Sequence, residues 1–178
     1  MKYEDLVRLL RKYGLPYATW GKGEGKDLFT LFKEVNAGET TLVEKDGKLL
    51  RRLECATVDV FYGEGSRRRY LREGGQVVNG VVRTRKRRWS LYEKRLPNEE
   101  PLTCALRGIR EELGIEGGLT LVPLEAVRED CDSASFPGLR TSYVFFPFDL
   151  VLPYELYRPE GYVDRSEAPR ELTFFGWS

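Results

Sequence analysis

The stretch from Glu93 to Ile115, EKRLPNEEPLTCALRGIREELGI, contains the strongest structural signals in the chain. Pro101 suits the first turn of a helix, where its missing N–H costs nothing, and Gly114 suits the position just after a helix end. Between them an apolar face repeats at helical spacing, and its members are Leu102, Ala105, Leu106, Ile109 and Leu113. The pattern predicts a helix from Pro101 to Leu113.

The other face of this predicted helix carries Arg107, Glu111 and Glu112. Two adjacent glutamates near the end of a helix do not stabilise it, because the helix dipole places partial negative charge there. Carboxylate oxygens are the ligands that a hard divalent cation such as Mg²⁺ prefers. The alternative is a solvated helix face, on which such glutamates and Arg-to-Glu spacings of four residues are common.

The same stretch resembles the box of the Nudix hydrolases, which reads G, five residues, E, seven residues, then R-E-U-x-E-E-x-G-U, where U is aliphatic. Seven of the nine defined positions match, and they are Glu99, Arg107, Ile109, Glu111, Glu112, Gly114 and Ile115. Two positions differ. Glu93 stands where the box has glycine, and Gly108 stands where it has glutamate.

The resemblance implies a hydrolase of a nucleoside diphosphate derivative or a related pyrophosphate, with Mg²⁺ or Mn²⁺ as cofactor. Glu111 and Glu112 would bind the metal, and Glu99 with Arg107 would form an ionic contact that holds the loop to the helix. Nudix proteins are often dimers, which leaves a homodimer open. Because the fold also hosts non-catalytic members, the alternative is an inactive Nudix-fold binding or regulatory module for a nucleotide or a protein partner.

Gly108 decides between these two interpretations. In the family, the glutamate at this position is a principal metal ligand, one helical turn before Glu112. Its absence predicts weaker metal binding, and a glycine inside a helix costs about 0.5–1 kcal/mol relative to alanine. The carboxylate of Glu93 is a candidate substitute for the missing ligand.

Outward from the box, helical spacing of leucines predicts two short helices, over residues 6–13 and 28–35. Alternation and turn signals predict a hairpin around Asp46-Gly47 and strands near residues 57–62, 119–122, 142–148 and 172–177. Residues 70–71, 77–78 and 81–82 should continue the sheet, with breaks at Gly74-Gly75 and Asn79-Gly80. Strands on both sides of one central helix indicate an α+β domain. The resemblance specifies a Nudix-type mixed sheet with the catalytic-type helix packed on it. We expect residues 1–50 to form an N-terminal helical extension and hairpin, and residues 51–178 to form the Nudix-like domain.

Two further groups are candidates for substrate binding. Arg83, Arg85 and Arg87 would share one face of a strand beside Trp89, which suits a polyphosphate or, as a weaker interpretation, a nucleic acid. The alternative is a charged strand that resists aggregation. Asp130 and Asp132, in a predicted polar loop, could bind substrate or supply a general base. The alternative is that they belong to an ordinary turn-rich loop.

The composition excludes several other classes. The 178 residues contain no histidine and three separated cysteines, which rules out a histidine triad and leaves too few ligands for a structural zinc. The N-terminal MKYEDLVRLL has charges among its apolar residues, unlike a signal peptide, and no apolar run is long enough to span a bilayer. We expect a soluble, cytoplasmic protein with reduced thiols and no membrane partner.

Overall fold

The computed structural model describes residues 1–22, 25–78, 80–84, 87–165 and 171–178. The chain divides into two compact units. Unit 1 comprises Met1–Glu54, Lys94–Glu99 and Val127–Phe145, and unit 2 comprises Cys55–Glu93, Glu100–Ala126 and Phe146–Ser178. The predicted division into residues 1–50 and 51–178 stays a prediction.

Within the described residues there are three α-helices, α1 (Tyr3–Lys12), α2 (Leu28–Asn36) and α3 (Pro101–Leu113). The same residues form ten strands, namely β1 (Thr41–Lys45), β2 (Lys48–Tyr62), β3 (Arg69–Val78), β4 (Val81–Arg83), β5 (Leu91–Lys94), β6 (Leu121–Pro123), β7 (Val127–Asp132), β8 (Arg140–Val151), β9 (Tyr162–Asp164) and β10 (Glu171–Trp177). No helix in the described part of the chain is long and apolar enough to cross a membrane. The predicted α+β class and N-terminal helical segment are confirmed.

The two predicted N-terminal helices are present in unit 1. Leu6 and Leu10 of α1 are fully buried, one turn apart, and Gly14 follows in the left-handed conformation at φ 62°. Helix α2 begins after Asp27, whose carboxylate accepts a hydrogen bond of 2.7 Å from the backbone N–H of Thr30. This is the N-cap geometry that satisfies an otherwise unpaired amide.

Replacing Asp27 with alanine is expected to lower the free energy of unfolding by about 1 kcal/mol, the usual contribution of an N-cap carboxylate. The measurement is urea unfolding of wild type and variant. Asp27→Asn, which retains an oxygen acceptor, serves as the control and should lose much less. Equal losses in both variants would contradict the capping role.

The predicted hairpin around Asp46-Gly47 is confirmed. Strands β1 and β2 are antiparallel, and Lys45 lies opposite Lys48, so the turn contains only Asp46 and Gly47. Both turn residues have positive φ, at 50° and 71°, as this tight hairpin turn requires.

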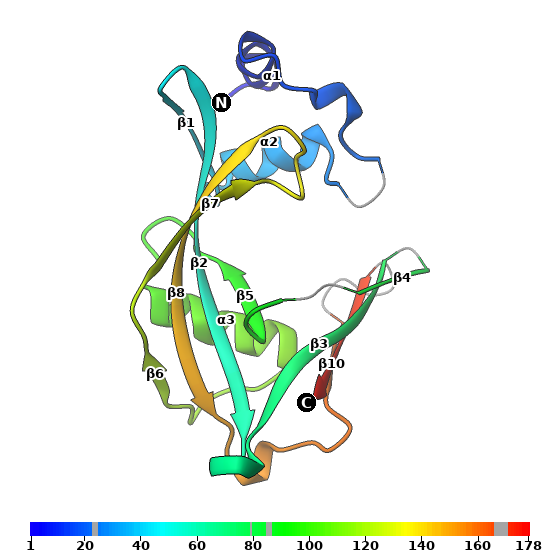
Figure 1. Cartoon of the computed structure of the whole chain (residues 1–178), viewed down its shortest axis with the longest axis vertical. Helices are drawn as coiled ribbons and strands as arrows, with labels where there is room; N and C mark the ends of the chain where they lie inside the picture. The colour runs from blue at the N-terminus through cyan, green and yellow to red at the C-terminus, as the bar shows by residue number, and fades with distance from the viewer. Residues whose placement is uncertain (23–24, 79, 85–86, 166–170) are drawn as a thin grey trace. The chain divides into compact units, whose positions relative to one another are not determined.

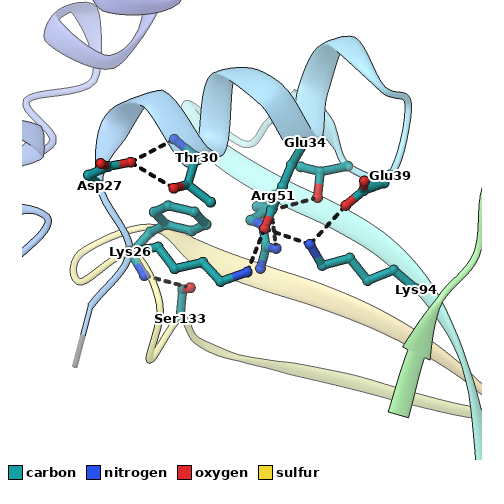
Figure 2. A network of polar contacts seen from close by, with 10 residues as sticks. Lys26, Asp27, Thr30, Glu34, Glu39, Arg51, Lys94 and Ser133 are labelled. Carbon is teal, nitrogen blue, oxygen red and sulfur yellow. Dashed lines mark hydrogen bonds and ion pairs between the residues drawn. The ribbon is translucent and has the colours of Figure 1, made fainter. Parts of the chain in front are cut away.

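A buried carboxylate in unit 1 joins α2 to β2 and to Lys94, the last residue of β5 (Figure 2). Glu34 is 4% exposed and lies 2.9 Å from the Lys26 ammonium, 2.7 Å from the Arg51 guanidinium and 2.5 Å from the Lys94 ammonium. Burial alone would raise the pKa of Glu34, but the three cations outweigh it and lower the pKa to about 2. Glu34 is therefore ionised throughout the neutral range.

The apolar core of unit 1 is formed by buried side chains from three separate parts of the sequence, and the ring of one of them, Phe136, lies 5.1 Å from the Arg51 guanidinium. They are Leu6, Leu10, Trp20, Leu31, Leu49, Phe136 and Leu139. Without Phe136 and Leu139, which lie near residue 140, the helices near the N-terminus would lack part of the surface that buries their leucines.

Unit 2 is built on an antiparallel ladder between β3 and β10, which run side by side in Figure 1, with β9 on the far edge of β10. The predicted break at Gly74-Gly75 does not end the strand. Strand β3 continues through both glycines, with a shift of register against β10 between Phe174 and Phe175. The ladder to β10 supplies hydrogen bonds along this stretch, with Gly75 opposite Phe174, and this tertiary pairing outweighs the weak strand preference of glycine.

Candidate functional site

Helix α3 has the predicted bounds. Pro101 occupies the first turn, and Gly114 ends the helix in the left-handed conformation at φ 66° while its N–H donates to the Arg110 carbonyl at 3.0 Å. The predicted apolar face is correct for Ala105, Ile109 and Leu113, which are buried in the core of unit 2. It is wrong for Leu102 and Leu106, which are 47% and 38% exposed. The buried side instead includes Cys104 and Gly108.

The two departures from the Nudix box meet in space. An ideal Cβ on Gly108 would lie 2.9 Å from Cβ and 3.3 Å from Cγ of Glu93. Real side chains do not approach this closely, so the Glu93 side chain occupies the space that any larger residue at position 108 would need. The glycine in the helix and the glutamate on β5 are therefore coupled. Relative to the Nudix box, a glutamate is missing from the helix at position 108 and is present on the strand at position 93. This pair of differences is called the exchange here.

Arg107 is held by this exchanged side chain. Its guanidinium lies 2.7 Å from Oε1 of Glu93 and 3.4 Å from Oε2 of Glu111, one helical turn further on. Glu111 also lies 3.7 Å from Arg110, and its side chain is 44% exposed. Glu111 therefore belongs to the arginine-bearing, solvated side of α3.

Glu112 faces a different environment, because adjacent helix residues point about 100° apart. It is half-buried, and burial is the main cause that raises its pKa to about 8. Arg87 opposes this shift, whereas the neighbouring carboxylates of Glu93, Asp164 and Glu73 add to it. The six residues Glu73, Arg87, Glu93, Arg107, Glu112 and Asp164 are called the carboxylate–arginine cluster here.

Glu73 is the member of this cluster that sequence reasoning missed. Its side chain is 1% exposed on β3, and its carboxylate lies 3.0 Å from the Arg87 guanidinium. The signal that could have revealed it is alternation, because Leu71 and Gly75 are also buried and a charged residue between them points inward. Arg87, predicted to bind substrate, is thus a partner of a buried carboxylate and also lies 5.0 Å from the Tyr92 ring.

The carboxylates do not fit the divalent cation that the sequence resemblance implies. Glu111 and Glu112 point to different sides of α3, and the guanidinium of Arg107 lies 3.4 Å from Glu111. Glu73 and Glu93 already have guanidinium partners. Within the described residues, no group of three or more aspartate, glutamate or cysteine side chains is arranged so that it could hold a metal ion.

The remaining predicted site residues are distributed as follows. Glu99 belongs to unit 1 and accepts a hydrogen bond of 2.9 Å from the Leu96 N–H, and its predicted contact with Arg107 stays a prediction. Arg85 lies outside the described residues. Trp89 is only 6% exposed, and its stacking on a ligand also stays a prediction.

The sequence predicted that Asp130 and Asp132 lie in a loop, and this is wrong. Both belong to strand β7, where they pair in register with Ser142 and Arg140 of β8, and both are exposed. The ladder to β8 extends further than the turn-rich composition indicated, since tertiary pairing decides where a strand ends. Their predicted roles toward a substrate stay predictions.

No family model matches the sequence, and no curated protein matches it. The structure is similar to Nudix-domain proteins at low sequence identity. One is the Ap4A hydrolase of C. elegans, at a TM-score of 0.35 and 14% identity, with 57% of this chain and 70% of that chain covered. Another is the Nudix domain of Shewanella oneidensis NrtR in complex with ADP ribose, at 0.35 and 14%, with 58% and 62% covered. TM-scores this low carry no argument about the activity or ligand of this chain.

Proposed function

We propose that this chain is a ligand-binding module of Nudix type that does not hydrolyse a pyrophosphate. The observation that carries the proposal is the pairing of Arg107 with Glu93 at 2.7 Å over Gly108, where the family motif has a metal-binding glutamate. The chain neutralises this part of its helix with its own guanidinium group. A divalent cation would have to displace that group.

The charges of the carboxylate–arginine cluster support the same conclusion. Two of its carboxylates, Glu73 and Glu93, are paired with Arg87 at 3.0 Å and with Arg107 at 2.7 Å. A divalent cation at the cluster would have to compete with these guanidinium groups for the carboxylate oxygens. The first pair joins β3 to the segment before β5, and the second joins β5 to α3, so both serve a structural purpose.

A metal-dependent hydrolase is the second candidate, and one observation favours it. Glu93, Asp164 and Glu73 all contribute to the raised pKa of Glu112, and a bound cation relieves this kind of repulsion between carboxylates. In that case Glu112, with Glu93 in place of the missing helix glutamate, would hold Mg²⁺ or Mn²⁺. The substrate would be a nucleoside diphosphate derivative or a related pyrophosphate.

The test is release of nucleoside monophosphate from a panel of nucleoside diphosphate derivatives, with Mg²⁺ or Mn²⁺, by wild type and Glu112→Gln. The expected result is that wild type shows no metal-dependent turnover above the Glu112→Gln background. Turnover by wild type that requires the metal and disappears in Glu112→Gln would overturn the proposal and establish the hydrolase.

A further inference from the structure

A pocket of about 360 Å³ is lined entirely by residues of unit 1, and no member of the carboxylate–arginine cluster is among them. The first half of its floor is one face of the paired strands β1 and β2. Leu49 and Arg51 of β2 point to the buried side, so Arg52 points to the other face. Thr41 of β1 lies opposite Arg52 and shares that face, and both line the pocket.

The hairpin of β7 and β8 supplies the second half of the floor. Arg128 lies opposite Val144 in the ladder. Ser142 is two residues before Val144 on β8 and therefore lies on the same face. All three line the pocket. Leu96 and Pro97, from the segment before α3, form an apolar wall. The pocket thus combines three separate segments of the sequence, so no local motif could have predicted it.

The charges that line the pocket are not balanced. The carboxylate of Glu39 is paired with Lys94 at 3.0 Å, and that of Glu54 is paired with Arg95 at 2.7 Å. Among the residues that the structure describes, Arg52 and Arg128 have no ion pair. The pocket therefore holds two exposed guanidinium groups whose hydrogen-bond donors have no partner in the described part of the chain.

We propose that this pocket binds a small organic phosphate, of up to about the size of a mononucleotide. Arg52 and Arg128 would hold the phosphate, because the guanidinium group matches phosphate oxygens in pairs of parallel hydrogen bonds. The hydroxyls of Thr41 and Ser142 would donate further hydrogen bonds. Val144, with the wall formed by the segment before α3, would contact the organic part. A volume of this size lies in the range of small-molecule sites.

This inference rests on the proposed function, since it names the class of ligand that the module binds and places the ligand in unit 1. It assigns the binding role to residues outside the box. Helix α3 then contributes to the stability of unit 2 and has no part in holding the ligand.

The test is isothermal titration of the full chain with adenosine 5′-monophosphate, inorganic phosphate and adenosine, in the presence of EDTA so that no metal contributes. The expected result is binding of the monophosphate with a Kd below about 1 mM. Adenosine, without the charge, should bind at least tenfold more weakly. Raising the salt concentration should weaken binding of the monophosphate, because salt screens the attraction between exposed charges.

Arg52→Gln and Arg128→Gln should each weaken binding of the monophosphate by roughly 10- to 100-fold, the usual effect of losing a hydrogen bond to a charged group. Arg140→Gln is the matched control, since Arg140 is an exposed arginine of the same unit that does not line the pocket. It removes the same charge and should retain wild-type affinity. Amide spectra of each variant establish that it is folded, and Val144→Trp, which fills the pocket without changing charge, should also abolish binding.

Two results would overturn the inference. One is the absence of monophosphate binding by the wild type at millimolar concentration. The other is equal binding by wild type, Arg52→Gln and Arg128→Gln, which would place the ligand elsewhere and leave the proposal of a non-hydrolytic module intact. Failure of that earlier proposal has a separate readout, which is metal-dependent hydrolysis of nucleoside diphosphate derivatives.

Discussion

Glu34→Gln is expected to lower the free energy of unfolding of unit 1 by about 3–5 kcal/mol, the usual cost of removing one partner from a buried ion pair. The Arg51 guanidinium is 3% exposed and lies 2.7 Å from Glu34, so the variant leaves it buried without an anionic partner. One of its nitrogens, Nε, already has no hydrogen-bond partner. The protein therefore has little capacity to accommodate the loss.

The measurement is equilibrium urea unfolding, with amide hydrogen exchange in α2 to show that unit 1 is the part that opens. Glu44→Gln is the matched control, because Glu44 pairs with Lys12 at 3.0 Å on the surface, with both side chains more than half exposed. Such pairs contribute about 0–1 kcal/mol. Similar losses of unfolding free energy in Glu34→Gln and Glu44→Gln would show that the buried network contributes no more to stability than a surface ion pair.

The pH dependence of stability provides a second test of the Glu34 network, with wild type and Glu34→Gln. The pKa of Glu34 is lowered in the folded state from 4.5 to about 2, so its stabilisation is present above pH 4.5 and is lost as the pH falls toward 2. The stability difference between wild type and Glu34→Gln should therefore shrink across this window. A difference that stays constant from pH 5 to pH 2 would contradict the assigned cause.

Gly108→Glu is expected to destabilise unit 2, by about 1–3 kcal/mol, although glutamate is a far better helix former than glycine. The new Cβ would lie 2.9 Å from Cβ of Glu93, so the strand or the helix has to move. The double variant Glu93→Gly/Gly108→Glu removes this contact while it restores both residues of the box. It should be more stable than Gly108→Glu alone.

Metal binding provides the second readout of this exchange. In the double variant, residue 108 places a carboxylate one turn before Glu112, and Arg107 no longer has Glu93 as a competing partner. We expect Mn²⁺ affinity, measured by titration, to be at least tenfold higher in the double variant than in wild type, an effect of about 1.4 kcal/mol. Glu93→Gly alone is the control, since it removes the Glu93 partner of Arg107 without adding a ligand at residue 108. Equal Mn²⁺ affinity in all the variants would contradict the exchange.

Local signals in the sequence predicted the elements whose ends they mark. Pro101 and Gly114 defined α3 because proline has its φ fixed at a value that suits the first turn, and glycine takes the left-handed conformation after a helix end without steric cost. Asp46-Gly47 defined the first hairpin for the same reason. The Nudix-like spacing also located the helix that carries Glu112.

The sequence did not predict the features that depend on tertiary contacts. Glu34 and Glu73 look like ordinary surface glutamates until their distant cations, Arg51 and Arg87, are placed beside them. The contact of Glu93 with Gly108 joins two departures from the box that seemed unrelated in sequence. The pocket of unit 1 needs β1, β2, β7, β8 and the segment after β5 together, so no single stretch contains its pattern.

The discontinuity of unit 1 affects how the protein is made. The leucines of α1 and α2 are buried partly against Phe136 and Leu139, which are synthesised about a hundred residues later. At a translation rate of roughly 5–20 residues per second, these apolar faces wait on the order of 5–20 s for their partners. During that interval the nascent chain exposes two apolar segments that are too short to form stable helices without the core. Protection by the ribosome surface or by a chaperone matters most in this window.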